Sequence, residues 1–188
     1  MKDKAKEFYK KVIADYNANK KYKQMGDLAK KTDFFEDAIF AFTQIEDYEK
    51  VGDIYEKMGD NTKAIEMYNK QIDKIHEKHT KTIVLKNNKL ETFTYLNDEV
   101  TEKLLPLYYK VGKVKEIQKY YSSKIKTAED THAGYEYILE LAEKGFLHDK
   151  YFEVCERNNE YNKALNYAQN NGFKEKSELY QSIVNMMK

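Results

Sequence analysis

The sequence predicts an all-α protein, a solenoid in which antiparallel helix hairpins stack on one another. First, helix breakers are scarce, since the 188 residues include one proline and seven glycines, and this favours helices over a turn-rich sandwich. Second, apolar residues recur at spacings of three and four in most segments, as on amphipathic helices. Third, similar segments recur along the chain, and such self-similarity is the mark of repeat architectures.

The N-terminal third reads as a series of helices with clear breaks. Residues 3–17 form one apolar stripe, made by Ala5, Phe8, Tyr9, Val12, Ile13 and Tyr16. After a break at 17–20, a second helix begins near Tyr22 and is interrupted at Thr32–Asp33, where Asp33 is expected to cap the next helix. Gly59-Asp60-Asn61 strongly predicts the end of one helix and the start of the next, because glycine suits a left-handed C-cap and Asp or Asn suits an N-cap.

Setting Gly26 against Gly52 shows a repeat with a 26-residue step. Further positions then match: Tyr22 with Tyr48, Met25 with Val51, Ala38 with Ala64, and Phe42 with Tyr68. The segment 4–13 also matches 63–72, and 107–125 aligns to 54–72 without a gap. Helix pairs joined by tight turns form αα-hairpins, and stacking of the hairpins supplies the core that one hairpin lacks.

The spacing Tyr48–Val51–Gly52–Tyr55–Ala64–Tyr68 resembles the tetratricopeptide repeat, and Tyr22–Met25–Gly26–Ala29–Ala38–Phe42 is similar, with Ala29 in place of the expected Tyr. The closing proline of the family is missing, His76 stands near its place, and the step is shorter than the usual ~34 residues. These departures are similar to the short, proline-free repeats of coat and intraflagellar-transport subunits. The resemblance covers 4–72 well, 104–125 fairly and 146–170 weakly. It implies a right-handed α-solenoid and specifies no ligand.

Residues 79–99 differ from the repeats, because β-branched and aromatic residues flank Lys86-Asn87-Asn88-Lys89 in an arrangement with hairpin character. The competitor is a helix running from residue 61 to about 95, against which Asn-Asn and the threonines weigh. We expect one α-solenoid domain over 1–188, with regular repeats at 1–79, a non-repeat insertion or linker at 80–97 and irregular helical repeats at 98–188.

The C-terminal half reads as further helices. Asn97-Asp98 caps a helix in which Pro106 is expected to start a turn or impose a kink. Helices are then expected at 130–144, 147–157, 160–171 and 174–187. Gly145 and Asn159 mark joints between them, and Asn171-Gly172 ends the penultimate helix.

Composition and motifs argue against catalysis. There is no glycine-rich phosphate loop, and the HEKH around His76 and His79 is not the HExxH zinc motif. The single cysteine, Cys155, is expected to be a small buried hydrophobe rather than a nucleophile. We therefore expect no enzymatic activity, no metal and no cofactor. No apolar run approaches the ~18 residues of a membrane span, and no signal core opens the chain, so a cytoplasmic location is expected.

In the resembled family, first-helix residues offset from the packing positions line an inner groove. Carried onto this register, the candidate groove residues are Lys20, Lys23, Asp27 and Lys30 in the first hairpin and Glu46, Glu49, Asp53 and Glu56 in the second. One strip is basic and its neighbour acidic. Either the strips neutralise each other across the hairpin boundary, each exposed pair contributing about 0–1 kcal/mol, or they form a bipolar groove that orients a peptide or helix of mixed charge.

The predicted function is a protein–protein interaction scaffold or adaptor, binding a peptide, a helix or a subunit of a larger assembly through the groove or a solenoid end. The alternative is a nucleic-acid-binding helical repeat that uses lysine clusters at 10–11, 20–23 and 30–31. A net charge of +1 and a single arginine, Arg157, weigh against nucleic acid, because its binders usually show a basic excess and favour arginine.

The two terminal helices carry apolar stripes, whereas a solenoid needs polar outer faces at its ends. We expect at least one end to be a docking surface, for the rest of a longer polypeptide or for another subunit. The alternative is that the lysine-rich helix 3–17 is itself the cap.

Overall fold

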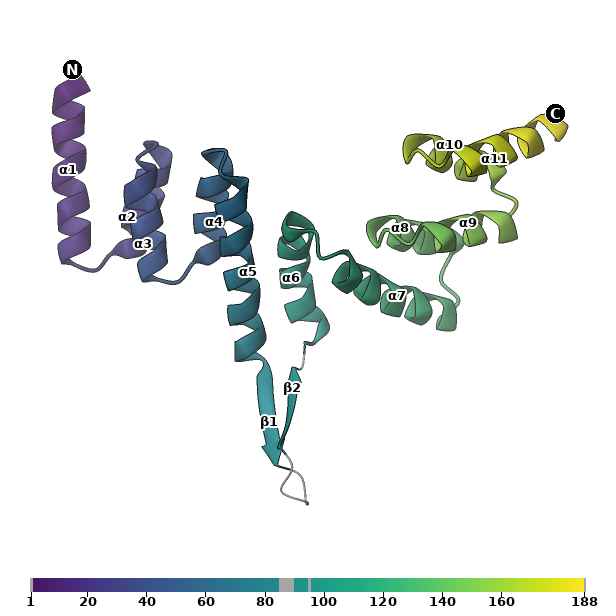
Figure 1. Cartoon of the computed structure of the whole chain (residues 1–188), viewed down its shortest axis with the longest axis horizontal. Coiled ribbons are helices and arrows are strands. Elements are labelled where there is room, and N and C mark those ends of the chain that lie inside the picture. Colours follow the sequence, from purple (N-terminus) through teal and green to yellow (C-terminus); the bar gives the residue numbers. More distant parts are fainter. Residues whose placement is uncertain (1, 85–89, 95, 188) are drawn as a thin grey trace. The chain divides into compact units, whose positions relative to one another are not determined.

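The structure is a computed structural model that describes residues 2–84, 90–94 and 96–187 (Figure 1). Helices joined by short turns dominate it, and helices consecutive in sequence pack on each other. The predicted helical architecture is thus confirmed, whereas the handedness of a solenoid remains a prediction. The chain divides into two compact units, Met1–Val111 and Gly112–Lys188. Each is described by itself, and their joining into one solenoid domain also remains a prediction.

The first unit contains six described helices and one β-hairpin. The helices are α1 (Lys2–Ala18), α2 (Tyr22–Lys31), α3 (Phe35–Gln44), α4 (Tyr48–Lys57), α5 (Asn61–Lys78) and α6 (Asp98–Val111). Helix α2 pairs with α3 and α4 pairs with α5, and the two hairpins meet through α3 and α4 (Figure 1). Helix α1 packs on α2, and α6 packs on α5.

The second unit contains five described helices. They are α7 (Val114–Asp130), α8 (Tyr135–Lys144), α9 (His148–Arg157), α10 (Tyr161–Asn170) and α11 (Lys174–Met186). The expected helix at 130–144 is wrong at its start, because α7 continues to Asp130 and a turn follows. In this turn His132 has a φ of 56°, and the Ala133 N–H donates to the Ala128 carbonyl at 2.8 Å.

A 13-residue step underlies the 26-residue repeat. Helices begin at residues 22, 35, 48 and 61 in the first unit and at 135, 148, 161 and 174 in the second. Each of the six turns between them holds one residue at positive φ: Asp33, Glu46 and Gly59, then Phe146, Asn159 and Gly172. The N–H of the following residue donates to the carbonyl five positions back, as from Asp47 to Phe42 at 3.0 Å. This is the Schellman C-cap, which satisfies the last carbonyls of a helix.

Two of the predicted N-caps are confirmed and one is wrong. Asp60 accepts from the Lys63 N–H at 3.1 Å, and Asn97 accepts from the Val100 N–H at 2.9 Å. Asp33 does not cap α3, because it takes the left-handed position of the turn with a φ of 60°. The N-cap is the next residue, which makes no side-chain cap bond. Pro106 lies inside α6, so it starts no turn.

The segment between α5 and α6 contains an antiparallel hairpin of β1 (Thr80–Val84) and β2 (Leu90–Thr94). Thr80 pairs with Thr94, and Val84 pairs with Leu90. The predicted hairpin character is confirmed for these strands, and the alternative of a helix reaching residue 95 is wrong because α5 ends at Lys78. Residues 85–89 and 95 of the expected insertion lie outside the described residues.

The first unit seats aromatic rings of one helix against glycines of its partner helix. A Cβ built on Gly26 would lie 2.7 Å from the ring of Phe42, and one on Gly52 would lie 2.5 Å from the ring of Tyr68. Both rings are buried, at 0% and 2% exposure. The glycines therefore let the helices of each hairpin approach until ring meets backbone.

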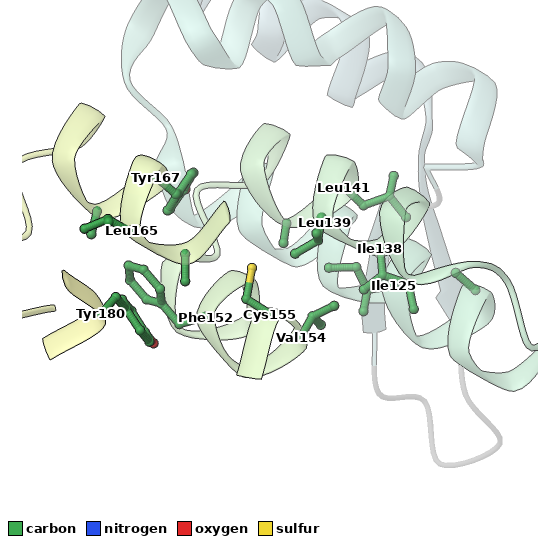
Figure 2. Close-up of a cluster of buried hydrophobic side chains, with 14 of the residues drawn as sticks. Ile125, Ile138, Leu139, Leu141, Phe152, Val154, Cys155, Leu165, Tyr167 and Tyr180 are labelled. Atoms are coloured by element: carbon green, nitrogen blue, oxygen red, sulfur yellow. The ribbon is translucent and has the colours of Figure 1, made fainter. Parts of the chain in front are cut away.

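The second unit is filled by one cluster of buried side chains (Figure 2). Its labelled members are Ile125, Ile138, Leu139, Leu141, Phe152, Val154, Cys155, Leu165, Tyr167 and Tyr180. The Phe152 ring stacks on Tyr180 with centroids 5.5 Å apart. Cys155 is fully buried, as predicted, and burial raises the pKa of its thiol to about 11.

Candidate partner-binding surface

The eight candidate residues lie on α2, on α4 and in the turns that precede them, and we call them the charged face. They are Lys20, Lys23, Asp27, Lys30, Glu46, Glu49, Asp53 and Glu56. All eight side chains are exposed or half-buried. The two sets occupy equivalent places, as the φ angles of 54° for Lys20 and 53° for Glu46 illustrate. At three of the four equivalent positions the charge changes sign between α2 and α4, and at the fourth both helices carry Asp.

A lysine covers the ring in the first hairpin and joins it to the charged face. The Nζ of Lys50 lies 4.6 Å from the centroid of the Phe42 ring and 3.4 Å from Oδ1 of Asp27. A cation over an aromatic face is attracted by the ring quadrupole. The neighbouring helix α4 thus neutralises the central aspartate of α2.

The same arrangement recurs one hairpin later. The Nζ of Lys110 lies 4.4 Å from the centroid of the Tyr68 ring and 2.5 Å from Oδ1 of Asp53. Lys110 belongs to α6, so the helix after the β-hairpin supplies the cation that Lys50 supplies in the first hairpin. A second link from α5 to α6 joins His76 Nε2 and the Tyr108 hydroxyl at 2.8 Å.

Asp53 is the most connected residue of the charged face. The Tyr68 hydroxyl donates to Asp53 at 3.0 Å and to Glu56 at 2.7 Å. Burial by itself raises the pKa of Asp53, but hydrogen bonds from Lys110 and Tyr68 and the charges of Lys110 and Lys30 outweigh it and lower the pKa. Burial, followed by the bonds to Glu56 and Asp53, raises the pKa of Tyr68, so its hydroxyl keeps its proton and donates.

The structure brings only part of the charged face together. Lys30 and Asp53 form an ion pair across the hairpin boundary at 3.7 Å, which is the predicted neutralisation of the two strips. Glu46 pairs instead with Lys74 of α5 at 2.9 Å. Four others have no counter-ion within 4.0 Å among the residues that the structure describes: Lys20, Lys23, Glu49 and Glu56.

An open depression of about 510 Å³ lies beside the ion-paired centre of the face, lined by Asp27, Lys30, Lys31 and Lys57. Lys57 in turn binds Asp33 at 2.7 Å. Reasoning from the sequence placed Asp27 and Lys30 on this surface but missed the three residues that hold it: Lys50, Tyr68 and Lys110. The sequence predicts Tyr68 only as a packing residue. Its role as a hydrogen-bond donor could have been inferred from its hydroxyl group, which Phe42 at the equivalent position lacks.

Within the described parts of the chain, no three His, Cys, Asp or Glu side chains are grouped to hold a metal ion. No helix in the same residues is long and apolar enough to cross a membrane. A scan of the sequence against models of protein families matches none of them. A search of curated proteins likewise finds no significant match.

Proposed function

We propose that the protein is an interaction scaffold or adaptor, whose first unit binds a peptide, a helix or a subunit of a larger assembly on the charged face. The observation that carries this proposal is that four side chains of the charged face have no counter-ion within 4.0 Å among the described residues. Two lie on or beside α2, Lys20 and Lys23, and two lie on α4, Glu49 and Glu56. Complementary charge on a partner gives specificity and speeds association.

The support beneath these side chains strengthens the proposal. The rings of Phe42 and Tyr68 pack against a glycine within each hairpin. Lys50 and Lys110 form ion pairs that join each hairpin to a helix that follows it. A surface held in one geometry loses less conformational freedom when a partner binds. The face is thus preorganised as well as charged.

A terminal helix offers a second route to a partner. In α1 the side chain of Phe8 is 70% exposed and lines an apolar groove of about 420 Å³ together with Tyr9, Val12, Tyr16, Leu28 and Thr32. In α11 Leu179 is 49% exposed. Exposed apolar patches often mark interaction sites, so docking at an end remains part of the proposal.

Nucleic acid is the less supported partner, because the net charge is only +1 and two lysines of the proposed basic clusters are engaged by carboxylates. Lys11 pairs with Glu7 at 3.4 Å, and Lys30 pairs with Asp53 at 3.7 Å. Lysines that neutralise phosphates release counterions from the nucleic acid, and lysines already paired with carboxylates contribute less. A cytoplasmic role without catalysis or cofactor completes the proposed function.

The test is affinity capture from native lysate with three matched baits. They are the wild type, the face variant Glu49→Lys/Glu56→Lys, and a control variant Glu66→Lys/Glu77→Lys, which makes the same charge change at exposed positions of α5. We expect a protein partner that the wild type and the control retain and the face variant loses. Identical proteins on all three baits would contradict the role of the charged face. Binding of single- or double-stranded probes that falls steeply with salt would favour the nucleic-acid alternative.

A further inference from the structure

Helix α1 is fixed to the first unit through one aromatic residue and presents the preceding one to solvent (Figure 1). The Tyr9 ring stacks on Phe34 with centroids 4.0 Å apart, and its hydroxyl donates to Asp37 of α3 at 2.8 Å. Phe8 is 70% exposed. Successive residues of a helix lie about 100° apart around its axis, so the packing of Tyr9 against α3 turns Phe8 away from the core. The orientation of the exposed ring is therefore fixed by the fold.

A groove beside Phe8 suits an apolar side chain of a partner. It has a volume of about 420 Å³ and is lined by Phe8 itself, by Tyr9, Val12 and Tyr16 of α1, and by Leu28 and Thr32 of α2. Val12, Tyr16 and Leu28 are half-buried, so an incoming ring would remove more of their apolar surface from water, which favours association. Helix α1 thus carries both a projecting ring and a groove that can receive one.

The charges beside Phe8 are also self-complementary. Glu7 and Lys11 form an ion pair within α1 at 3.4 Å, and both side chains are largely exposed. They lie two positions before and two positions after residue 9. When two copies of α1 run antiparallel about a twofold axis level with residue 9, Glu7 of each copy lies opposite Lys11 of the other. Exposed pairs contribute little to stability, so an exchange of partners costs little.

These features favour a second copy of the chain over other occupants of the groove. The occupant must supply an apolar side chain and, beside it, a base for Glu7 and an acid for Lys11. A twofold dimer joins the same patch of both subunits, so a second copy supplies all three at the required spacing. Helix α11 also exposes an apolar side chain, Leu179, but joining α11 of one copy to α1 of the next is a heterologous contact, which produces open-ended chains unless it closes into a ring.

We propose that two copies of the protein form a symmetric dimer through antiparallel α1 helices. The Phe8 ring of each copy lies in the groove between α1 and α2 of the other, and Glu7 pairs with Lys11 across the interface. This inference rests on the proposed function, in which docking at an end is the second route, and it names the docked subunit. An interface of one helix and its groove is smaller than the 1,200–2,000 Å² of standard interfaces, so the dimer is expected to dissociate on dilution.

Sedimentation equilibrium of the full chain over a range of concentrations is the first test. The wild type is expected to fit a monomer–dimer equilibrium without larger species. Phe8→Glu is expected to weaken the dimer about 100-fold or more, because burial of two rings is lost. Phe40→Glu is the matched control, since Phe40 of α3 is also exposed, at 45%, and lies outside the groove. Circular dichroism checks that each variant keeps its helices.

Charge reversal tests the reciprocity of the interface. Glu7→Lys and Lys11→Glu are each expected to weaken the dimer about tenfold, because two exposed ion pairs become contacts between like charges. An equimolar mixture of the two variants is expected to regain wild-type association, since every contact in the mixed dimer joins opposite charges. The double variant Glu7→Lys/Lys11→Glu is expected to regain it as well. Damage to the structure of one variant would not be repaired by adding the other.

The outcomes separate this inference from the proposed function. A wild type that stays monomeric at about 1 mM would overturn the dimer, and so would open-ended growth or a mixture of charge variants that does not associate. A protein captured from lysate by a monomeric wild type and lost by Phe8→Glu would place a different occupant in the groove, so that the dimer is wrong and docking at an end stands. Failure to capture any partner that depends on Phe8 or on the charged face would overturn the proposed function itself.

Discussion

The two units of the chain share one helix spacing and fill their hairpins in opposite ways. In the first hairpin of the first unit, the fifth residue of α2 is Gly26 and the eighth residue of α3 is Phe42. In α8 and α9 of the second unit, the same positions hold Leu139 and Cys155. The bulky side chain thus comes from the second helix in one unit and from the first helix in the other.

This difference shows that the helix spacing and the side chains of the core are determined by different features of the sequence. The 13-residue step follows from the backbone of the Schellman turns, which is shared by both units. The filling varies, because cores accept different side chains when total volume and pattern are kept. In the second unit the rings also meet each other, as Tyr151 and Tyr167 do at a centroid distance of 3.8 Å.

The largest effect is expected when the core side chains of α8 and α9 are replaced by those found at the same positions of α2 and α3. Leu139→Gly is expected to cost about 4 kcal/mol, since it empties a core position and places glycine in a helix. Adding Cys155→Phe is expected to recover about half of this loss, because the ring fills the space beside the new glycine. Urea unfolding followed by circular dichroism measures both variants. A double variant less stable than Leu139→Gly would show that the two fillings are not interchangeable.

The converse test fills the glycine position of the first unit. Gly52→Ala is expected to destabilise by about 1–2 kcal/mol, because overpacking against the buried Tyr68 ring exceeds the gain of about 1 kcal/mol in helix propensity. Thermal unfolding is the measurement. Gly134→Ala is the control, since the nearest atom to its new Cβ is 3.7 Å away. In a Tyr68→Leu background the stability lost through Gly52→Ala is expected to be smaller, because the shorter side chain leaves room for the new Cβ. Equal effects of Gly52→Ala and Gly134→Ala would contradict the close packing of the Tyr68 ring on the backbone at Gly52.

Tyr68→Phe tests the polar side of the same ring. It removes the hydroxyl that donates to Asp53 and Glu56, and a loss of about 1 kcal/mol in unfolding free energy is expected. Phe42→Tyr in the preceding hairpin is the reciprocal variant, and we expect it to cost less, because its hydroxyl would lie near Asp27. A larger loss for Phe42→Tyr than for Tyr68→Phe would show that the two hairpins are not equivalent.

Lys110→Met probes the ion pair with Asp53, and its effect depends on pH. The pKa of Asp53 is lowered in the folded state, so the pair stabilises above the ordinary Asp pKa of about 4 and the contribution fades as pH falls through the folded value. We expect a loss of about 0.5–1 kcal/mol at pH 7 that shrinks towards pH 3. Denaturant unfolding at both values is the measurement, and an equal loss at the two would mean that Lys110 acts through packing alone.

The smallest expected effect concerns Cys155, which reports on the second unit alone. Its raised thiol pKa of about 11 means that stability is full below the unfolded thiol pKa and declines as pH rises towards 11. Labelling with a thiol reagent at pH 8 is expected to be slow in the folded protein and fast in urea. Gly52→Ala is expected to leave the native labelling rate unchanged. An accelerated rate would show that the two units unfold together.

Local signals explain which parts of the fold were predictable. The predicted N-caps at Asp60 and Asn97 are confirmed, because a side-chain acceptor next to a helix start acts within one turn. The predicted N-cap at Asp33 is wrong. The left-handed position of these turns also accepts residues such as Glu46 and Phe146, so residue type alone does not show which residue takes that position. The end of α5 was predicted from composition, whereas the strand register depends on pairing between residues fourteen positions apart, such as Thr80 and Thr94.

By itself the sequence determined the repeat period, the apolar stripes and the sign of the charge on each helix, because these are properties of single segments. Only the tertiary structure decided which charges of the candidate surface are neutralised. Lys110 reaches Asp53 from 57 residues away, across the β-hairpin, and Lys30 meets Asp53 across the hairpin boundary. Such pairings depend on how helices of different hairpins are spaced and aligned, since an ion pair needs its atoms within about 4 Å.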